Sequence, residues 1–174
     1  MVKESFYAHS GAGQTSKTDD WSTAHHVVEY AYNRFHSPIT VGELNRNWFD
    51  TDPAASQYNY VAANYFTFKE NGLIQSWNGK VWLNPPYSRS IGQWIDKALF
   101  EVKSNLKCKS ITLCIPARTD TLWFHRLISN GAKVVFLKGR LKFGGGKSSA
   151  PFPSCLVHIE RGQKDIKTFY EAVL

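Results

Sequence analysis

The amino-acid sequence predicts an α/β domain built around one sheet, because segments with strand and helix patterns alternate along it. Residues 110–115 and 132–137 are apolar runs of the length expected for buried strands. Residues 91–102 carry apolar side chains three and four positions apart, which is the spacing of a helix face. Together these segments indicate helices packed on a sheet.

The chain is long enough for one domain with a sizeable core, and 43% of its 174 residues are hydrophobic. We expect residues 1–19 to form a flexible arm and residues 20–174 to form a single domain. No run of 18 or more apolar residues exists and the N-terminus is polar, so neither a membrane span nor a secretory signal is expected. The three cysteines lack C-x-x-C spacing, which favours the reducing cytoplasm over a disulfide framework, and no metal site is expected.

In the first half of the chain the pattern predicts one helix and several short strands. Ser22 or Thr23 is placed to cap a helix that runs to Phe35. The later expectations, in chain order, are a short strand with a turn of small residues at 48–56, a strand at 65–68, a hairpin-like turn at 69–72, and segments 73–77 and 80–83 flanking an Asn-Gly turn at 78–79.

The second half alternates helices with strands. Thr119 or Asp120 is placed to cap a helix that contains residues 123–128. The other expectations are the helix at 91–102, the strands at 110–115 and 132–137, a hairpin of residues 140–143 with 153–159, and a closing helix within 165–174.

The strand that ends at Leu83 runs directly into Asn84-Pro85-Pro86-Tyr87. Two consecutive prolines lack N–H donors and hold φ near −65°, so the chain must leave the sheet there. This tetrapeptide resembles the catalytic motif of amino-directed methyltransferases, which methylate an exocyclic or amide nitrogen. The Asn84 side-chain oxygen and the Pro85 carbonyl could accept the two N–H groups of such a nitrogen, and Tyr87 could stack on a base turned out of the duplex. The alternative is a turn that only ends the strand.

A second candidate site residue is Asp52, which is followed by the small-residue turn Pro53-Ala54-Ala55. A carboxylate can take a cationic amino group, and a turn of small side chains lets the backbone approach a nucleoside cofactor. The glycine-rich dinucleotide fingerprint is absent. Because Asp-Pro is also a common start of a turn, a purely structural turn remains the alternative.

The net charge of +7 is concentrated in residues 101–174, which hold 13 basic and 5 acidic residues. A one-sided basic surface favours a polyanion partner, since cations that neutralise phosphates supply nucleic-acid affinity. The candidates for contact with the nucleic-acid backbone are Arg118, Lys138, Arg140, Lys142 and Lys147. The glycines at 144–146 do not form a phosphate-binding loop, because that motif needs glycine at position 141 and Leu141 stands there. A solvated basic edge without a partner is the alternative.

Taken together, the ordered motifs resemble the phage-type (Dam-like) DNA N6-adenine methyltransferases over residues 20 to about 159. The motifs are Asp20-Trp21-Ser22-Thr23, Asp52-Pro53-Ala54-Ala55-Ser56 with Asn59, Asn71-Gly72-Leu73 with Trp77, residues 81–87, residues 115–121, residues 139–143 and residues 150–154. The resemblance implies a compact Rossmann-like sheet with reduced helices, an adenine-specific DNA methyltransferase activity and S-adenosylmethionine as the cofactor.

The same resemblance implies roles for further residues. Asp52 and its turn would hold the methionine part of the cofactor, and Trp21, Ser22 and Thr23 would pack on the same pocket. Asn71 falls where a related enzyme often places an acid toward the cofactor adenine. Double-stranded DNA is the implied partner, with no obligate protein partner and with the bacterial host cytoplasm as the location.

Two questions stay open at this point. Asp52 and Asn84 are 32 positions apart, about half of what three strands with intervening helices need, so either helices are missing or Asp52 is not the cofactor carboxylate. The acceptor could also be cytosine N4, RNA or a protein glutamine, and a catalytically silent DNA-binding module is the alternative outside enzymes.

Overall fold

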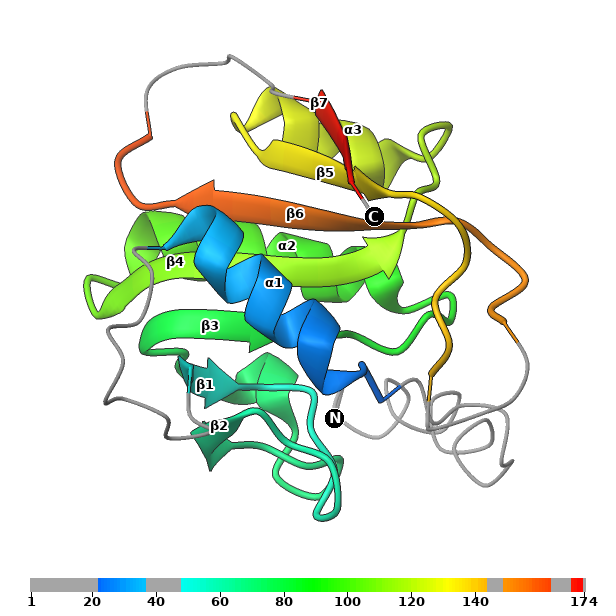
Figure 1. Cartoon of the computed structure of the whole chain (residues 1–174). Helices are drawn as coiled ribbons and strands as arrows, with labels where there is room; N and C mark the ends of the chain where they lie inside the picture. Colours follow the sequence, from blue (N-terminus) through cyan, green and yellow to red (C-terminus); the bar gives the residue numbers. More distant parts are fainter. Residues whose placement is uncertain (1–21, 37–47, 144–148, 164–169, 174) are drawn as a thin grey trace.

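The computed structural model describes residues 22–36, 48–143, 149–163 and 170–173, and these form one α/β unit around a seven-stranded sheet (Figure 1). The strands are β1 (Phe49–Asp52), β2 (Ala62–Tyr65), β3 (Gly79–Leu83), β4 (Cys108–Pro116), β5 (Lys133–Leu137), β6 (Ser154–Glu160) and β7 (Tyr170–Val173). The helices are α1 (His25–Phe35), α2 (Ile91–Ser104), α3 (Leu122–Ser129) and the short 3₁₀ helix η1 (Gly72–Ile74). The α/β fold predicted from the sequence is confirmed.

The strand order is β2-β1-β3-β4-β6-β5-β7. The pairs β2–β1, β1–β3 and β3–β4 are parallel, whereas β6 runs antiparallel to both β4 and β5. We call the edge where β1, β3 and β4 end the carboxyl edge; it lies to the right in Figure 1. Because β6 is antiparallel, Pro116 at the end of β4 lies opposite Ser154 at the start of β6, so the β5–β6 connection reaches the same edge.

The sheet is covered on both faces, with α1 on one face and α2 and α3 on the other (Figure 1). One apolar cluster joins α1 to Phe49 and Trp82, and a second joins α2 and α3 to Val81 and Leu83, so successive residues of β3 point to opposite cores. Strand β4 is buried at every position except Lys109, because it lies in the middle of the sheet between the two cores.

Helices are indeed missing between β1 and β3, where only β2 and the single turn η1 lie. This accounts for the short spacing between Asp52 and Asn84. The 3₁₀ turn packs tightly: a Cβ on Gly72 would lie 1.9 Å from the Pro53 carbonyl oxygen, so no other residue fits there. Trp77, fully buried, donates its indole N–H to the Gly72 carbonyl at 2.8 Å and fixes the turn against the core.

The hairpins expected in the first half of the chain are wrong. The strand lies at 62–65 rather than 65–68, and residues 73–77 form no strand. Asn71 (φ 57°) and Gly79 (φ 70°) do turn the chain, but they lead into η1 and into a parallel strand. Asp50 explains why the turn at Gly79 leads into a parallel strand. Its carboxylate accepts the Lys80 N–H at 2.7 Å and directs β3 alongside β1.

Two expectations for the later segments and both predicted helix caps are also corrected. Residues 140–143 form no strand, and the antiparallel partner of β6 is β5. Residues 170–173 form β7 beside β5 instead of a helix. The predicted side-chain caps at Ser22 or Thr23 and at Thr119 or Asp120 are wrong, since the helices begin after Ala24 and Thr121 without a side-chain cap.

The remaining expectations concern the arm, the cysteines and the membrane. The proposed arm at 1–19 lies outside the described residues. All three cysteines are buried and free. Among the helices that the structure describes, none has the length and apolarity needed to cross a membrane.

A buried polar cluster connects the end of α1 to β6. His158 is fully buried, with Nδ1 2.9 Å from the Thr112 hydroxyl and Nε2 2.9 Å from a Glu160 carboxylate oxygen. Phe35 stacks on His158 with ring centroids 4.6 Å apart, and His36 packs edge-on against it at 5.1 Å. Burial, with the nearby His158 and Lys80, lowers the pKa of His36 to about 4.

We predict that acid weakens the packing of α1 through His36. The unfolded chain binds a proton at this histidine below about pH 6.5, whereas the folded chain does so only below about pH 4. The unfolded state therefore binds more protons between these values, and the free energy of unfolding falls as the pH drops through that window. Urea denaturation at pH 7.5 and pH 4.5 measures this fall.

The matched variants are His36→Gln and His26→Gln. His36→Gln should flatten the fall, while His26→Gln, on the exposed side of α1, should leave it unchanged. An equal fall in His36→Gln and in the unmodified protein would place the acid sensitivity elsewhere.

Candidate active site

The topology places a switch point between β1 and β3 at the carboxyl edge. From β1 the chain moves outward to β2, whereas from β3 it moves the other way to β4, so the connections of these two neighbouring strands diverge. In open α/β sheets, ligands bind outside the carboxyl ends of strands at such a switch point. Asp52 is the last residue of β1 and Asn84 directly follows β3, so the two main candidate site residues flank this position.

The segment Asn84-Pro85-Pro86-Tyr87 leaves the sheet as its prolines require. Leu83 and Pro85 are buried, and Asn84 is partly exposed at the lip of the sheet. The Tyr87 side chain folds back, so that its hydroxyl lies 2.6 Å from Asn84 Oδ1 and 3.1 Å from the backbone carbonyl oxygen of Cys114. Burial is the main cause that raises the pKa of Tyr87 well above its usual value, so the hydroxyl keeps its proton.

The ring of Tyr87 is held from the side by two phenylalanines. Phe152 meets it edge-on at 5.3 Å between centroids and an interplanar angle of 85°, and Phe143 does so at 5.9 Å and 73°. Both come from the segment that connects β5 to β6. Sequence reasoning gave these rings no part in the site, although both lie in motifs that carry the family resemblance, at 139–143 and 150–154.

Asp52 is only 4% exposed and bonds to the backbone of its own turn. One carboxylate oxygen accepts the Val61 N–H at 3.2 Å, and the other lies 3.4 Å from the Ala54 nitrogen. Burial outweighs these two hydrogen bonds and raises the pKa of Asp52 to about 7. The carboxylate therefore holds both ends of the loop at 53–61 and is poised to change charge near neutral pH.

The other residues expected to bind a cofactor lie around this loop. The segment Pro53-Ala54-Ala55 directly follows β1, and the Ala55 N–H bonds to the Phe66 carbonyl at 3.0 Å. The Asn71 side chain accepts the Leu73 N–H at 3.2 Å, so the structure uses it as the cap of η1. Ser22 and Thr23 precede the end of α1 that lies toward the carboxyl edge (Figure 1). Trp21 lies outside the described residues.

Four of the five basic residues singled out from the sequence are exposed and follow strands that end at the carboxyl edge. Arg118 comes after β4, and Lys138, Arg140 and Lys142 come after β5; Lys147 lies outside the described residues. Two backbone hydrogen bonds fix these segments, from the Ala117 N–H to the Pro153 carbonyl at 2.9 Å and from the Ala150 N–H to the Leu141 carbonyl at 2.8 Å. Arg89, also exposed and two residues beyond Tyr87, is a further basic candidate that sequence reasoning missed.

Within the described part of the chain, no three His, Cys, Asp or Glu side chains come together in a way that could hold a metal ion. The site is instead built from a carboxamide, backbone carbonyls, one buried carboxylate and aromatic rings. These groups accept hydrogen bonds from amines or stack on flat rings.

Comparison with known proteins agrees with this geometry. A family model described as "DNA N-6-adenine-methyltransferase (Dam)" matches residues 11–164. A DNA N-6-adenine-methyltransferase of Escherichia phage T1 is 31% identical over 125 residues, which cover 71% of this chain and 46% of the relative. The chain thus spans about half the length of the curated relative that it matches. With most of its residues inside the family model and its Asn-Pro-Pro-Tyr segment at the switch point of the sheet, the chain belongs to the DNA N-6-adenine-methyltransferase (Dam) family.

Proposed function

We propose that this protein transfers a methyl group from S-adenosylmethionine to the N6 amino group of adenine in DNA. The single observation that carries the proposal is the position of Asn84 and Asp52 on either side of the switch point, in a chain of this family. One side of the switch point offers acceptors for an amino group, and the other offers a carboxylate for a cofactor.

The residues around Asp52 fit S-adenosylmethionine. Among the described residues, two backbone N–H groups donate to the buried Asp52 carboxylate, and a cationic amino group would stabilise its charged form further. Ala54 and Ala55 leave room for the backbone to approach a ligand. When bound, this cofactor supplies a methyl group activated by a sulfonium ion. The role of the protein would be to hold the methionine end of the cofactor near Asn84.

The acceptor side fits an exocyclic amine. The lone pair of such a nitrogen is delocalised into the base, so the nitrogen is a poor nucleophile. Two N–H bonds, to Asn84 Oδ1 and to the Pro85 carbonyl, would draw it toward tetrahedral geometry and aim its lone pair at the methyl group. Because the prolines fix the backbone that carries these acceptors, the rate enhancement would come from positioning and preorganised dipoles. The base must leave the duplex to reach them, and the Tyr87 ring would stack on it.

The exposed basic residues at the carboxyl edge fit the phosphate backbone. Lys138, Arg140 and Lys142 are on the segment whose Phe143 contacts Tyr87, so backbone contacts there would lie near the base pocket. Such contacts fix the register of the protein on DNA without reading its sequence.

The test is nucleoside mass spectrometry of unmethylated DNA incubated with the protein and S-adenosylmethionine. We expect N6-methyladenine from the unmodified protein. We expect none from Asn84→Ala, because that variant lacks one of the two acceptors. Its affinity for the cofactor should stay within a few fold, since Asn84 lies on the other side of the switch point from Asp52.

Other products of the same experiment assign other functions. N4-methylcytosine would change the acceptor and keep the mechanism. Bound cofactor without a methylated base would indicate RNA or protein glutamine as the acceptor. Absence of both methylation and cofactor binding would indicate a silent DNA-binding module.

A second prediction concerns the pH dependence of cofactor binding. The pKa of Asp52 is about 7 in the free protein, and a bound ammonium group would lower it. Binding then releases a proton below pH 7, so the affinity for S-adenosylmethionine should weaken as the pH falls, by up to about tenfold per pH unit. Isothermal titration calorimetry at pH 6, 7 and 8 measures this slope.

Asp52→Asn should bind more weakly at pH 8 and show a flatter slope below pH 7. Asp96→Asn is the matched control, because Asp96 lies on α2 and its exposed carboxylate pairs with Arg126. A flat slope in the unmodified protein would mean that Asp52 only holds its loop together.

A third prediction concerns the basic segment after β5. The double variant Arg140→Ala/Lys142→Ala should bind DNA more weakly. Each lost phosphate contact should reduce the magnitude of the slope of log K against log salt by roughly 0.9. Fluorescence anisotropy with a labelled duplex across a series of salt concentrations gives both quantities.

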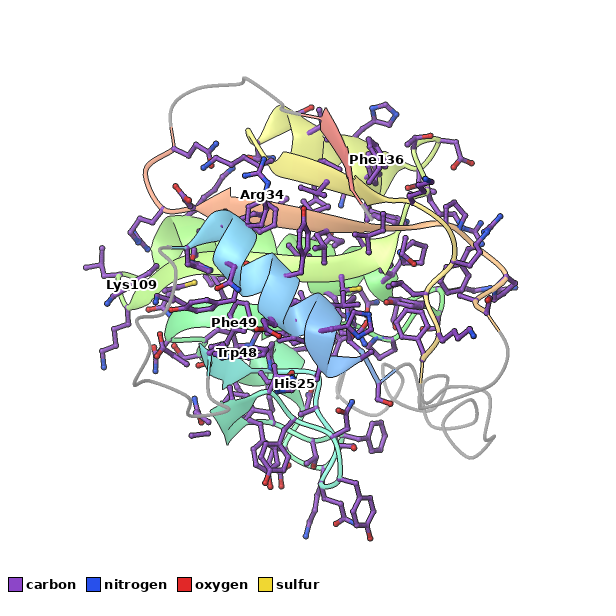
Figure 2. All side chains as sticks on the ribbon, viewed as in Figure 1. His25, Arg34, Trp48, Phe49, Lys109 and Phe136 are labelled. Atoms are coloured by element: carbon purple, nitrogen blue, oxygen red, sulfur yellow. The ribbon has the colours of Figure 1, made fainter. Side chains whose placement is uncertain are left out.

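The matched control is Lys107→Ala/Lys109→Ala, which removes the same charge. Both lysines are exposed at the start of β4, and Figure 2 shows Lys109 at the end of the sheet opposite to the carboxyl edge. An equal change of slope in both double variants would mean that DNA responds only to net charge.

A further inference from the structure

The Tyr87 hydroxyl lies between two oxygen atoms, and it can donate to only one of them at a time. Asn84 Oδ1 is at 2.6 Å and the Cys114 carbonyl oxygen is at 3.1 Å. A phenol carries one proton, and burial keeps that proton in place by raising the pKa of Tyr87. The contact with β4 follows from the register, because Leu83 pairs with Leu113, which brings the next residues, Asn84 and Cys114, alongside each other.

The ring of Tyr87 is positioned separately from its hydroxyl. Phe143 and Phe152 contact the ring edge-on, and Tyr87 also packs against the apolar clusters on both faces of the sheet. These contacts involve carbon atoms of the ring and do not need the hydroxyl. The side chain can therefore have two independent tasks, one for its ring and one for its oxygen.

We propose that the Tyr87 hydroxyl, with the Cys114 carbonyl behind it, positions the Asn84 carboxamide for methyl transfer. In the free protein the hydroxyl donates to Asn84 Oδ1 and holds the side chain against β4. When a base amine donates its N–H to Oδ1, the hydroxyl proton turns to the Cys114 carbonyl. Oδ1 is then left as a full acceptor for the amine. This inference rests on the proposed function and adds a positioning role that is separate from base stacking.

Physical chemistry favours this arrangement over a carboxamide that rotates freely. An asparagine without a partner for its side chain samples several rotamers, and only one presents Oδ1 to the base. An acceptor that already receives a strong hydrogen bond also attracts a second donor less. The Cys114 carbonyl gives the phenolic proton another partner at hydrogen-bonding distance, so Oδ1 can be released without leaving a buried hydroxyl unsatisfied.

The test is Tyr87→Phe, which removes one oxygen atom and keeps the ring. We expect kcat to fall about tenfold, because the loss of one ordinary hydrogen bond lowers the fraction of molecules in which Asn84 is oriented for methyl transfer. The KM for DNA and the Kd for S-adenosylmethionine should stay within twofold. Fluorescence of 2-aminopurine at the target adenine position, which reports base flipping, should match that of the unmodified protein.

Two further variants separate the tasks of ring and hydroxyl. Phe152→Leu loosens the side support of the ring and leaves the hydroxyl in place, so it should raise the KM for DNA and reduce the flipping signal more than it lowers kcat. Tyr32→Phe removes a hydroxyl that accepts a hydrogen bond from the Lys80 side chain at the start of β3, away from the carboxyl edge, and keeps a ring that packs edge-on against Phe49 at 5.5 Å; it should change none of these quantities.

Two outcomes would overturn this inference alone: unchanged kcat in Tyr87→Phe, or loss of the flipping signal in step with kcat. The first would show that the hydroxyl is not needed, and the second would show that it acts on the ring. If the unmodified protein methylates cytosine instead of adenine, the same comparison applies to that amine. If it methylates no amino group, the proposed function and this inference both fail.

Discussion

The parallel pairing of β3 with both β1 and β4 is the constraint on which the candidate site depends. It brings the end of β1, the end of β3 and the end of β4 to one edge, and with them Asp52, Asn84 and the Cys114 carbonyl. If β3 ran antiparallel to β1, Asn84 would lie at the opposite edge from Asp52, and if it ran antiparallel to β4, the Cys114 carbonyl would lie at the opposite edge from Asn84. Asp50 helps to set this direction, because its carboxylate bonds to the backbone of Lys80 at the start of β3.

The sequence predicted the elements with strong patterns and missed those that depend on distant contacts. Helix α2 and strand β4 carry long, clear periodicities, and the structure places both within two residues of the expected bounds. The strands β2 and β3 are short, and a short alternating run beside an Asn-Gly pair has the same pattern in a hairpin and in a parallel crossover. The contact of Asp50 with Lys80 and the close approach of Gly72 to Pro53 favour the parallel crossover. Neither contact has a local sequence signal.

The candidate site was predictable to a similar extent. The Asn-Pro-Pro-Tyr segment and Asp52 could be found because proline and acidic turns at strand ends leave a recognisable pattern. Their convergence at one switch point could not be found, since it required the parallel topology. The side supports of Tyr87 were also missed, because Phe143 lies 56 positions and Phe152 lies 65 positions after Tyr87 along the chain. Only the antiparallel return of β6 brings them back to the end of β3.

The replacement of helices by the single turn η1 has a consequence for the behaviour of the purified protein. Beside β2, at the margin of the sheet, large apolar side chains face solvent: Tyr58 is 88% exposed, Ile74 is 72% exposed and Phe68 is 52% exposed. A full helix in the crossover would have covered part of this surface. An edge strand that no other described strand or helix covers, and that is flanked by exposed apolar side chains, is a template for contact between copies of a chain. At high protein concentration, association is therefore expected to start at the β2 margin, and added salt should strengthen it by screening the net positive charge.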